Sequence, residues 1–392
     1  MTHHRLSSKM LGMLIYFFTF SAYYIPLTQR IPYLSSIGYT QNQVSIMLAI
    51  QAAIGFALQM IFGFLCDKYK TIKQFFYLSA IFGTIGVYWM FNVTQNIFFF
   101  HLLSVAVLSS FYNVAVALLD SWTLELDPLM RKSFGSIRAW GTIGWIMSGY
   151  LVTLIINHYG YQSLGLTFTI IVLIAMSLAY LLHDAIKEVH LAPLKMKDLN
   201  ELFSNQRFLI LVLALFFIFM LIGLDGLTVV LKMEALGAST AEKYYRFALA
   251  ALVELPFLFL GARLLKRFNS LHILALGTLV YLFRFILYGL VQTPTLMILA
   301  SLLQIISFPL VLIATKQLVF DESPKHLRSS GQMVAIACYM GLSGVMSPLI
   351  SASLIDWVGI DTTLILIGLM MLIPLGLIYR LNQAHSHSHN LT

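Results

Sequence analysis

Four charged side chains lie inside long apolar stretches of this chain, and they are the residues best able to do chemistry. Asp120 and Arg138 fall in the first half, and Glu254 and Arg284 fall in the second. A charge at the bilayer centre costs at least about 2.5–3.5 kcal/mol, so such residues are rare and usually face a bundle interior or a watery cavity. Acids and bases in the apolar stretches of both halves therefore predict a polar pathway through a membrane.

These residue types offer two kinds of chemistry. An ionised Asp120 only accepts hydrogen bonds and Arg138 offers five donors, so together they could hold adjacent hydroxyls, while Arg138 alone could hold a carboxylate at two points. Glu254 could carry a proton, because burial raises the pKa of a carboxyl group and a nearby arginine such as Arg284 lowers it. In both halves the alternative is an ion pair that only joins helices.

The composition indicates a membrane protein. Of 392 residues, 59% are hydrophobic and 10% are charged, whereas soluble domains are about 45–50% apolar and 25% charged. The formal charge of +8 comes from scattered basic residues, a pattern that does not favour nucleic-acid binding. Cys66 and Cys338 give neither a disulfide framework nor metal-ligand spacing. The chain has no Gly-x-x-x-x-Gly-Lys loop for phosphate, and we expect no cofactor.

Twelve stretches are long and apolar enough to span a bilayer, which takes about 20 residues. The apolar run after Lys9 is too long for a cleavable signal peptide and lacks a small-residue cleavage site. The predicted spans are Met10–Pro26, Gln43–Leu65, Phe75–Phe91, Ile97–Trp122, Ser136–Ile156, Ser163–Leu182, Phe208–Leu231, Tyr245–Leu264, Leu271–Val291, Thr295–Leu318, Ser330–Leu354 and Thr362–Tyr379.

Basic residues predict the orientation, because cytoplasmic loops carry an excess of Lys and Arg. Alternate loops are rich in them, and Arg30, Lys232 and Lys243 are exceptions on the opposite side. We expect both termini to be cytoplasmic. The basic residues on the cytoplasmic side are Arg5, Lys9, Lys68, Lys70, Lys73, Arg131, Lys132, Lys187, Lys195, Lys197, Arg207, Arg263, Lys266, Arg267, Lys325 and Arg328.

The longest polar stretch divides the chain into two halves. We predict an N-terminal six-helix bundle at 1–182, a cytoplasmic central loop at 183–207, a C-terminal six-helix bundle at 208–382 and a cytoplasmic tail at 383–392. The tail alternates His and Ser, at His385, His387 and His389. For this tail we expect disorder ahead of metal binding.

Glycine motifs recur between the halves. Gly141-Thr-Ile-Gly144 and Gly341-Leu-Ser-Gly344 start 200 residues apart, and Gly63 and Gly261 lie 198 residues apart. With an even number of spans per half, such repeats are parallel and typically bind substrate at their interface near the membrane midplane. Chance recurrence is the alternative, since small residues are common wherever membrane helices pack closely.

Two motifs resemble the major facilitator superfamily. Gly63-Phe-Leu-Cys-Asp67-Lys68 is similar to the signature between that superfamily's second and third spans, although Lys70-Thr-Ile stands where a glycine is usual. Phe134-Gly-Ser-Ile-Arg138-Ala-Trp-Gly-Thr-Ile-Gly-Trp145 resembles the fifth span of the lactose permease group, which includes nucleoside and phenylpropionate permeases. In that group an acid precedes the arginine by 18 positions, as Asp120 precedes Arg138 here.

The resemblance implies an all-α integral membrane protein with twelve transmembrane helices in two six-helix bundles, the major facilitator fold. It implies that Asp120 and Arg138 bind substrate, that Trp145 stacks on a sugar ring, and that Asp67 and Lys68 form a gate.

In the second half the resemblance implies that Glu254 and Arg284 serve proton coupling. Gln304, predicted to bind substrate, and Ser307 stand where the lactose permease carries a histidine and a glutamate on span ten, aligned on Pro309. The proton-carrying acid of that permease therefore has no counterpart at its own position, and the coupling mechanism stays open.

Together these features predict a secondary active transporter of the cell membrane, working as a monomer by alternating access. We expect symport of protons with a small polar organic solute, with a sugar or oligosaccharide as the first choice. The alternatives are uptake of a nucleoside or an aromatic acid, and efflux of a drug or metabolite. A membrane-embedded enzyme is the least favoured class, because the charges are spread singly through both halves.

Overall fold

The computed structural model describes residues 8–185, 202, 204–249, 267–324, 331 and 334–389, except the side chains of Asp67, Lys132 and 384–389. The described residues are helical apart from turns and short connections. The chain divides into two compact units, Met1–His190 and Leu191–Thr392.

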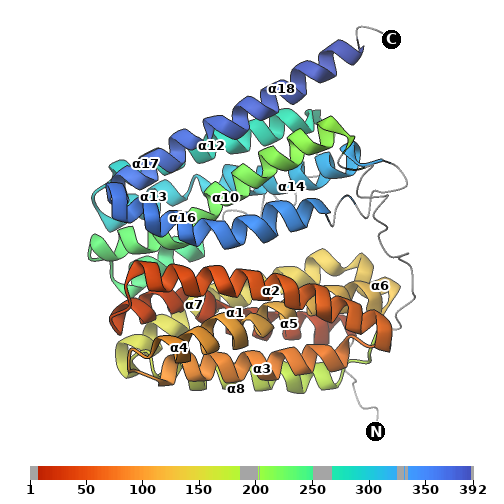
Figure 1. The fold of residues 1–392 in the computed structure, drawn as a ribbon. Helices are drawn as coiled ribbons and strands as arrows, with labels where there is room; N and C mark the ends of the chain where they lie inside the picture. The colour runs from red at the N-terminus through yellow and green to blue at the C-terminus, as the bar shows by residue number, and fades with distance from the viewer. Residues whose placement is uncertain are drawn as a thin grey trace. The chain divides into compact units, whose positions relative to one another are not determined.

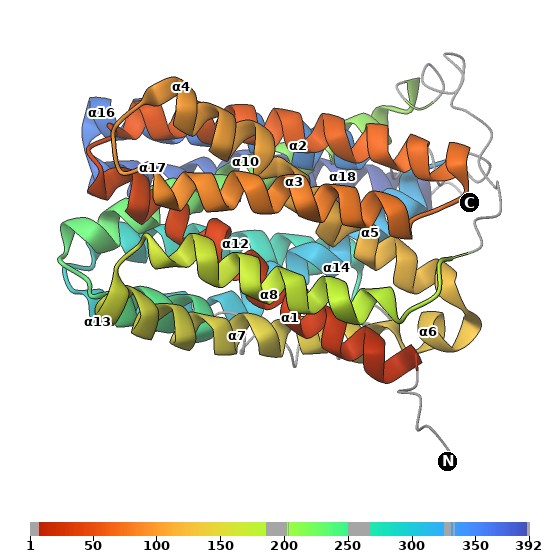
Figure 2. The same cartoon turned by 90° about the horizontal axis from the view of Figure 1, so that it is seen from below.

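The N-terminal unit places α1 along α7 and α8, and packs α3 against α5 and α8, an arrangement that can be followed in Figure 2. Its fourth span, Phe98–Leu126, is interrupted by a π-helical segment, a feature often found at functional sites. Its helices are α1 (Ser8–Ser36), α2 (Gln41–Tyr69), α3 (Lys73–Asn92), α4 (Phe98–His101), η1 (Leu102–Leu108), α5 (Ser110–Leu126), α6 (Pro128–Lys132), α7 (Phe134–Tyr159) and α8 (Ser163–Tyr180).

The C-terminal unit, green to blue in Figure 1, packs α10 against α16 and α18, and α12 against α14 and α17. A further helix runs from residue 240 to 249, where the described stretch ends. The named helices are α10 (Gln206–Ala235), α12 (Ser270–Leu290), α13 (Pro294–Ser301), α14 (Gln304–Glu322), η3 (Ala337–Leu342), α16 (Ser343–Val358), α17 (Ile360–Met370) and α18 (Leu372–His389).

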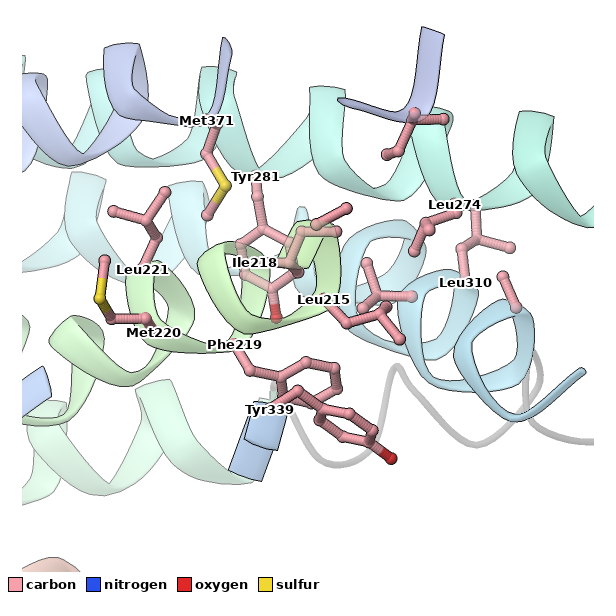
Figure 3. Close-up of a cluster of buried hydrophobic side chains, with 14 of the residues drawn as sticks. Leu215, Ile218, Phe219, Met220, Leu221, Leu274, Tyr281, Leu310, Tyr339 and Met371 are labelled. Atoms are coloured by element: carbon pink, nitrogen blue, oxygen red, sulfur yellow. The ribbon is translucent and has the colours of Figure 1, made fainter. Parts of the chain in front are cut away.

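Large apolar side chains fill the core of the C-terminal unit. Leu215 and Ile218 of α10 are fully buried beside Leu274 of α12 and Leu310 of α14, and Tyr281 extends into the same cluster (Figure 3). Between membrane helices such contacts stabilise through van der Waals packing, since lipid tails are as apolar as these side chains. This packing fixes the helices that carry the charged residues described below.

Eleven described helices or helix pairs are long and apolar enough to cross a membrane. They coincide with eleven of the twelve predicted spans, and most of the remaining one, Tyr245–Leu264, lies outside the described residues. The first span is longer than predicted, because α1 continues through Pro26 and Pro32 to Ser36; membrane helices tolerate proline where neighbours satisfy the freed backbone groups. The tail expected to be disordered extends α18 to His389.

One interhelical contact recurs in both units. Ser148 of α7 donates a hydrogen bond to the carbonyl oxygen of Ser21 in α1 at 2.7 Å, and Ser347 of α16 donates one to that of Met220 in α10 at 2.8 Å. Donors and acceptors are each 199 residues apart (347 minus 148, and 220 minus 21). The repeat seen in the glycine motifs is therefore also a repeat of helix packing.

Candidate functional site

Asp120 and Arg138 lie together in the N-terminal unit, on α5 and α7. Arg138 Nε is 3.7 Å from Asp120 Oδ1, and the two side chains are 36% and 39% exposed. The Tyr16 hydroxyl donates to Asp120 Oδ1 at 2.7 Å. The Arg138 guanidinium lies 3.9 Å from the ring centroid of Phe20, a cation–π arrangement. The predicted pair is thus brought together, but at a separation longer than a hydrogen bond.

A second ion pair shows what a tight pair looks like in this protein. Arg207 Nε and Nη2 donate to the two carboxylate oxygens of Glu322 at 3.1 and 2.9 Å. That geometry satisfies both partners in the bidentate manner that suits a structural link. The Asp120–Arg138 pair lacks it, so it adds about 0–1 kcal/mol to stability, as partly exposed pairs do.

Trp145 lies two helical turns beyond Arg138 on the same face of α7. It packs edge-on against Tyr24 with ring centroids 5.0 Å apart and against Tyr23 at 6.1 Å, and it is half-buried. Residues seven positions apart share a helix face, so α7 presents both side chains toward α1.

The C-terminal unit holds a denser charged cluster around Asp225 of α10. Arg246 Nη2 donates to both carboxylate oxygens of Asp225 at 2.7 and 2.8 Å, and Arg284 Nη2 lies 3.5 Å from Oδ2. The side chains of Arg246 and Arg284 are 6% and 2% exposed. Two buried guanidiniums therefore share this carboxylate.

Arg284 is further held by polar groups of its own unit. Its Nε donates to the Tyr288 hydroxyl at 2.8 Å, its Nη1 donates to Gln304 Oε1, and Ser307 Oγ lies 3.4 Å from Nη1. The guanidinium also lies over the rings of Tyr281 and Tyr288, 5.3 and 5.1 Å from their centroids. Gln304, predicted to bind substrate, is thus a neighbour of Arg284.

The remaining predicted residues lie elsewhere. Glu254 and the side chain of Asp67 are outside the described residues. Lys68 is exposed near the end of α2, with its ammonium 5.4 Å from the ring centroid of Tyr69. At the helix end Lys70 adopts φ of +52°, a left-handed conformation usual for glycine at this place.

Sequence reasoning missed two arginines. Arg246 falls just inside the predicted span Tyr245–Leu264 and should have been counted as an intramembrane charge. Arg30 was taken as a loop residue because the first span was ended at Pro26, whereas α1 carries it inside the helix. The partner of Arg284 that the structure shows, Asp225, comes from a helix 59 residues away in sequence, which spacing alone could not reveal.

Comparison with known proteins gives consistent results. A family model described as the MFS_1 like family matches residues 10–388. The transporter YwbF of Bacillus subtilis (strain 168) is 22% identical over 358 residues, covering 89% of this chain and 87% of that protein. The maltose permease of Geobacillus stearothermophilus is 24% identical over 281 residues, covering 71% and 69%. A crystal structure of a mutant of the nucleoside transporter NupG superposes with a TM-score of 0.83 at 16% identity, covering 96% of this chain and 100% of that one.

The candidate spans and the charged clusters within them define a multi-pass membrane protein. The chain belongs to the MFS_1 like family, and it is a membrane transporter with the major facilitator fold. The resemblance drawn from the motifs around Asp67 and Arg138 is confirmed at this level.

Proposed function

We propose that this transporter takes up a small polyhydroxylated solute together with protons, a sugar or oligosaccharide being the first choice. The loose Asp120–Arg138 pair is the observation that carries the proposal. A carboxylate and a guanidinium that are not locked onto each other can turn toward adjacent hydroxyls of a solute. Phe20 and Trp145 add ring faces on the same side of the helices.

The names of the relatives support two solute classes. A maltose permease among them favours a sugar, and the fold similarity to a nucleoside transporter keeps a nucleoside as the second candidate. Both solutes offer neighbouring ring hydroxyls, and a nucleoside base would stack on an aromatic side chain such as Trp145. On this proposal Gln304 supplies a further polar contact from the second half.

Proton coupling is assigned to Glu254, with Arg284 as its electrostatic partner. Arg284 cannot lose its proton in a protein, so within the proposed pair the carboxyl group of Glu254 is the one that binds and releases a proton. Glu254→Gln should abolish uphill accumulation and keep exchange across the membrane, because the amide mimics a permanently protonated acid. Uphill accumulation with unchanged pH dependence would place the coupling acid elsewhere, and Asp120 would then be the candidate.

The topology proposal completes this scheme. Both termini and the central loop 183–207 would face the cytoplasm, and alternating access would come from motion of the six-helix bundles at 1–182 and 208–382, as in transporters built from repeats. Asp67 and Lys68 would act in closing the cytoplasmic side. We propose that the monomer is sufficient, since a single chain supplies both compact units.

Uptake into vesicles tests the proposal. Purified protein is reconstituted, a pH gradient is imposed with the outside acidic, and entry of radiolabelled maltose and uridine is followed. Accumulation of one of them that collapses when a protonophore is added is the expected result. No accumulation of either solute, or accumulation insensitive to the protonophore, would refute the proposed function.

A further inference from the structure

Arg30 is a second guanidinium inside the N-terminal unit, and the proposed function does not use it. It lies in α1, two turns from the helix end, and is half-buried. Its Nη1 donates to Gln51 Oε1 of α2 at 2.6 Å. Its Nε is buried and has no hydrogen-bond partner among the described residues.

The charge of Arg30 also lacks a counter-charge. Arg138 has Asp120, and Arg246 and Arg284 share Asp225, but Arg30 forms no ion pair with a carboxylate in the described part of the chain. An arginine stays protonated in a protein, and a charge inside a membrane span is costly unless it is compensated. A cation with no carboxylate beside it among the described residues is suited to bind the anionic group of a solute.

The surroundings of Arg30 hold its guanidinium in one orientation. Gln51 Nε2 donates to Ser109 Oγ at 2.8 Å, and Ser110 Oγ donates to the Gln51 carbonyl oxygen at 3.1 Å. Ser109 directly follows the π-helical segment Leu102–Leu108. Gln51 uses Nη1, so the opposite edge of the guanidinium, formed by Nε and Nη2, is the one that a carboxylate or phosphate would bind at two points.

Arg30 shares a helix face with the candidate site. Tyr16, Phe20, Tyr23 and Arg30 follow the three- and four-residue spacing of one α-helical face. Phe20 contacts Arg138, and Tyr23 contacts both Phe20 and Trp145 with ring centroids 6.2 and 6.1 Å apart. The ten residues from Phe20 to Arg30 correspond to about 15 Å along α1. Aromatic rings therefore extend from the Asp120–Arg138 pair to Tyr23, seven residues before Arg30 on the same face of α1.

We propose that Arg30 binds the oxyanion of an acidic solute, so that the transported solutes include sugar acids or sugar phosphates. This inference rests on the proposed function and extends it to acidic sugars. Phe20, which contacts Arg138, lies about 15 Å along α1 from Arg30, a stretch of helix longer than a sugar ring. A small acidic sugar therefore occupies Arg30 and the Asp120–Arg138 pair in turn, moving along the aromatic rings between them.

Binding to the purified full-length protein tests this assignment. Glucuronate, glucose 6-phosphate and glucose are titrated, and the midpoint concentration for thermal stabilisation is measured. At least one acid should bind about tenfold or more tighter than glucose, since hydrogen bonds to a charged group are stronger than those between neutral groups. Glucuronate as the tighter ligand indicates a carboxylate, and glucose 6-phosphate indicates a phosphate. Equal binding of all three sugars would overturn the proposal.

Two variants make the test specific. Arg30→Gln should bring the acids to within about twofold of glucose, because only the charge-assisted contacts are lost. Arg131→Gln is the matched control, since Arg131 is exposed and donates to the Leu124 carbonyl oxygen at 2.8 Å, and it should keep the acid preference. An acid preference that persists in Arg30→Gln contradicts the assignment.

A measurement on the unmodified protein covers the case in which Arg30→Gln does not fold. Either acid, but not glucose, should slow the reaction of Arg30 with phenylglyoxal, followed by peptide mass spectrometry. An unchanged reaction rate, or no reaction at all, would overturn the proposal. If the proposed transport function is wrong but this inference is right, the acids bind at Arg30 and no sugar enters the vesicles.

Discussion

Replacing Asp225 by asparagine should destabilise the C-terminal unit strongly. The substitution keeps the shape of the side chain and one acceptor oxygen, but it leaves Arg246 and Arg284 without the carboxylate that they share. Arg284 keeps Tyr288 and Gln304 as acceptors. Arg246 keeps the one remaining acceptor oxygen and, among the described residues, its ring contacts with Phe247 and Tyr288.

The size of the effect follows from burial. Removing one partner of a buried ion pair costs about 3–5 kcal/mol, mostly because the other charge is left uncompensated. The Asp225 side chain is 23% exposed, while its partners are 6% and 2% exposed. The lower end of the range therefore applies, and Asp225→Asn should lower the free energy of unfolding by about 3 kcal/mol.

Unfolding of the purified protein in mixed micelles, followed by circular dichroism, measures this change. Combining Asp225→Asn with Arg246→Gln should cost at least about 1 kcal/mol less than the sum of the two single substitutions, because the pair is coupled. Glu242→Gln is the control, because Glu242 is a partly exposed acid of the same unit that accepts hydrogen bonds from the backbone N–H and the hydroxyl of Ser239 at a helix start. It should change stability by less than about 0.5 kcal/mol. A comparably small effect of Asp225→Asn would refute the reasoning.

Two further predictions concern helix packing and helix ends. Gly144→Val should lower the free energy of unfolding by about 3 kcal/mol, because a Cβ atom there meets the Phe17 carbonyl oxygen and Ser21 Oγ of α1 and overpacking costs about 1–3 kcal/mol or more. Gly135→Val is the control, since a Cβ atom at that position of the same helix meets no other atom within 4 Å. Equal unfolding free energies of the two variants would contradict the packing argument. Lys70→Gly should raise the free energy of unfolding by about 0.5–1 kcal/mol, since Lys70 ends α2 with a φ of +52° that costs a non-glycine residue about 1–2 kcal/mol. A lower melting temperature for this variant would show that the Lys70 side chain contributes more to stability than the backbone strain costs.

Much of the fold could be predicted from the sequence, because the bilayer imposes a simple length and polarity rule on each span. The repeat was visible in Gly141 and Gly341, since close helix contacts require small residues. The end of α1 was mispredicted at Pro26, because proline ends helices in water more reliably than in membranes. The π-helical segment before Ser109 has no residue type that marks it.

The candidate site was predictable only in part. Asp120 and Arg138 were found together because a family motif preserves their spacing, and the structure places them in contact. The Asp225–Arg246–Arg284 cluster joins three separate helices, so its pairing depends on tertiary packing that spacing does not encode. Arg30 became visible as an uncompensated charge only when its neighbours in α1 and α2 were known.

The central claim is that Asp120 and Arg138 bind solute rather than merely join α5 to α7, and a charge exchange tests it most directly. Asp120→Asn and Arg138→Gln should each lower solute uptake into vesicles by about tenfold or more, since each removes charge-assisted hydrogen bonds of about 1.5–3 kcal/mol. The double variant Asp120→Arg with Arg138→Asp restores an ion pair at the same place but reverses the order of donor and acceptor. We predict that it folds with a melting temperature close to that of the unmodified protein and transports no better than the single variants. Uptake restored to the unmodified level would show that the pair is only a structural link and would contradict this account.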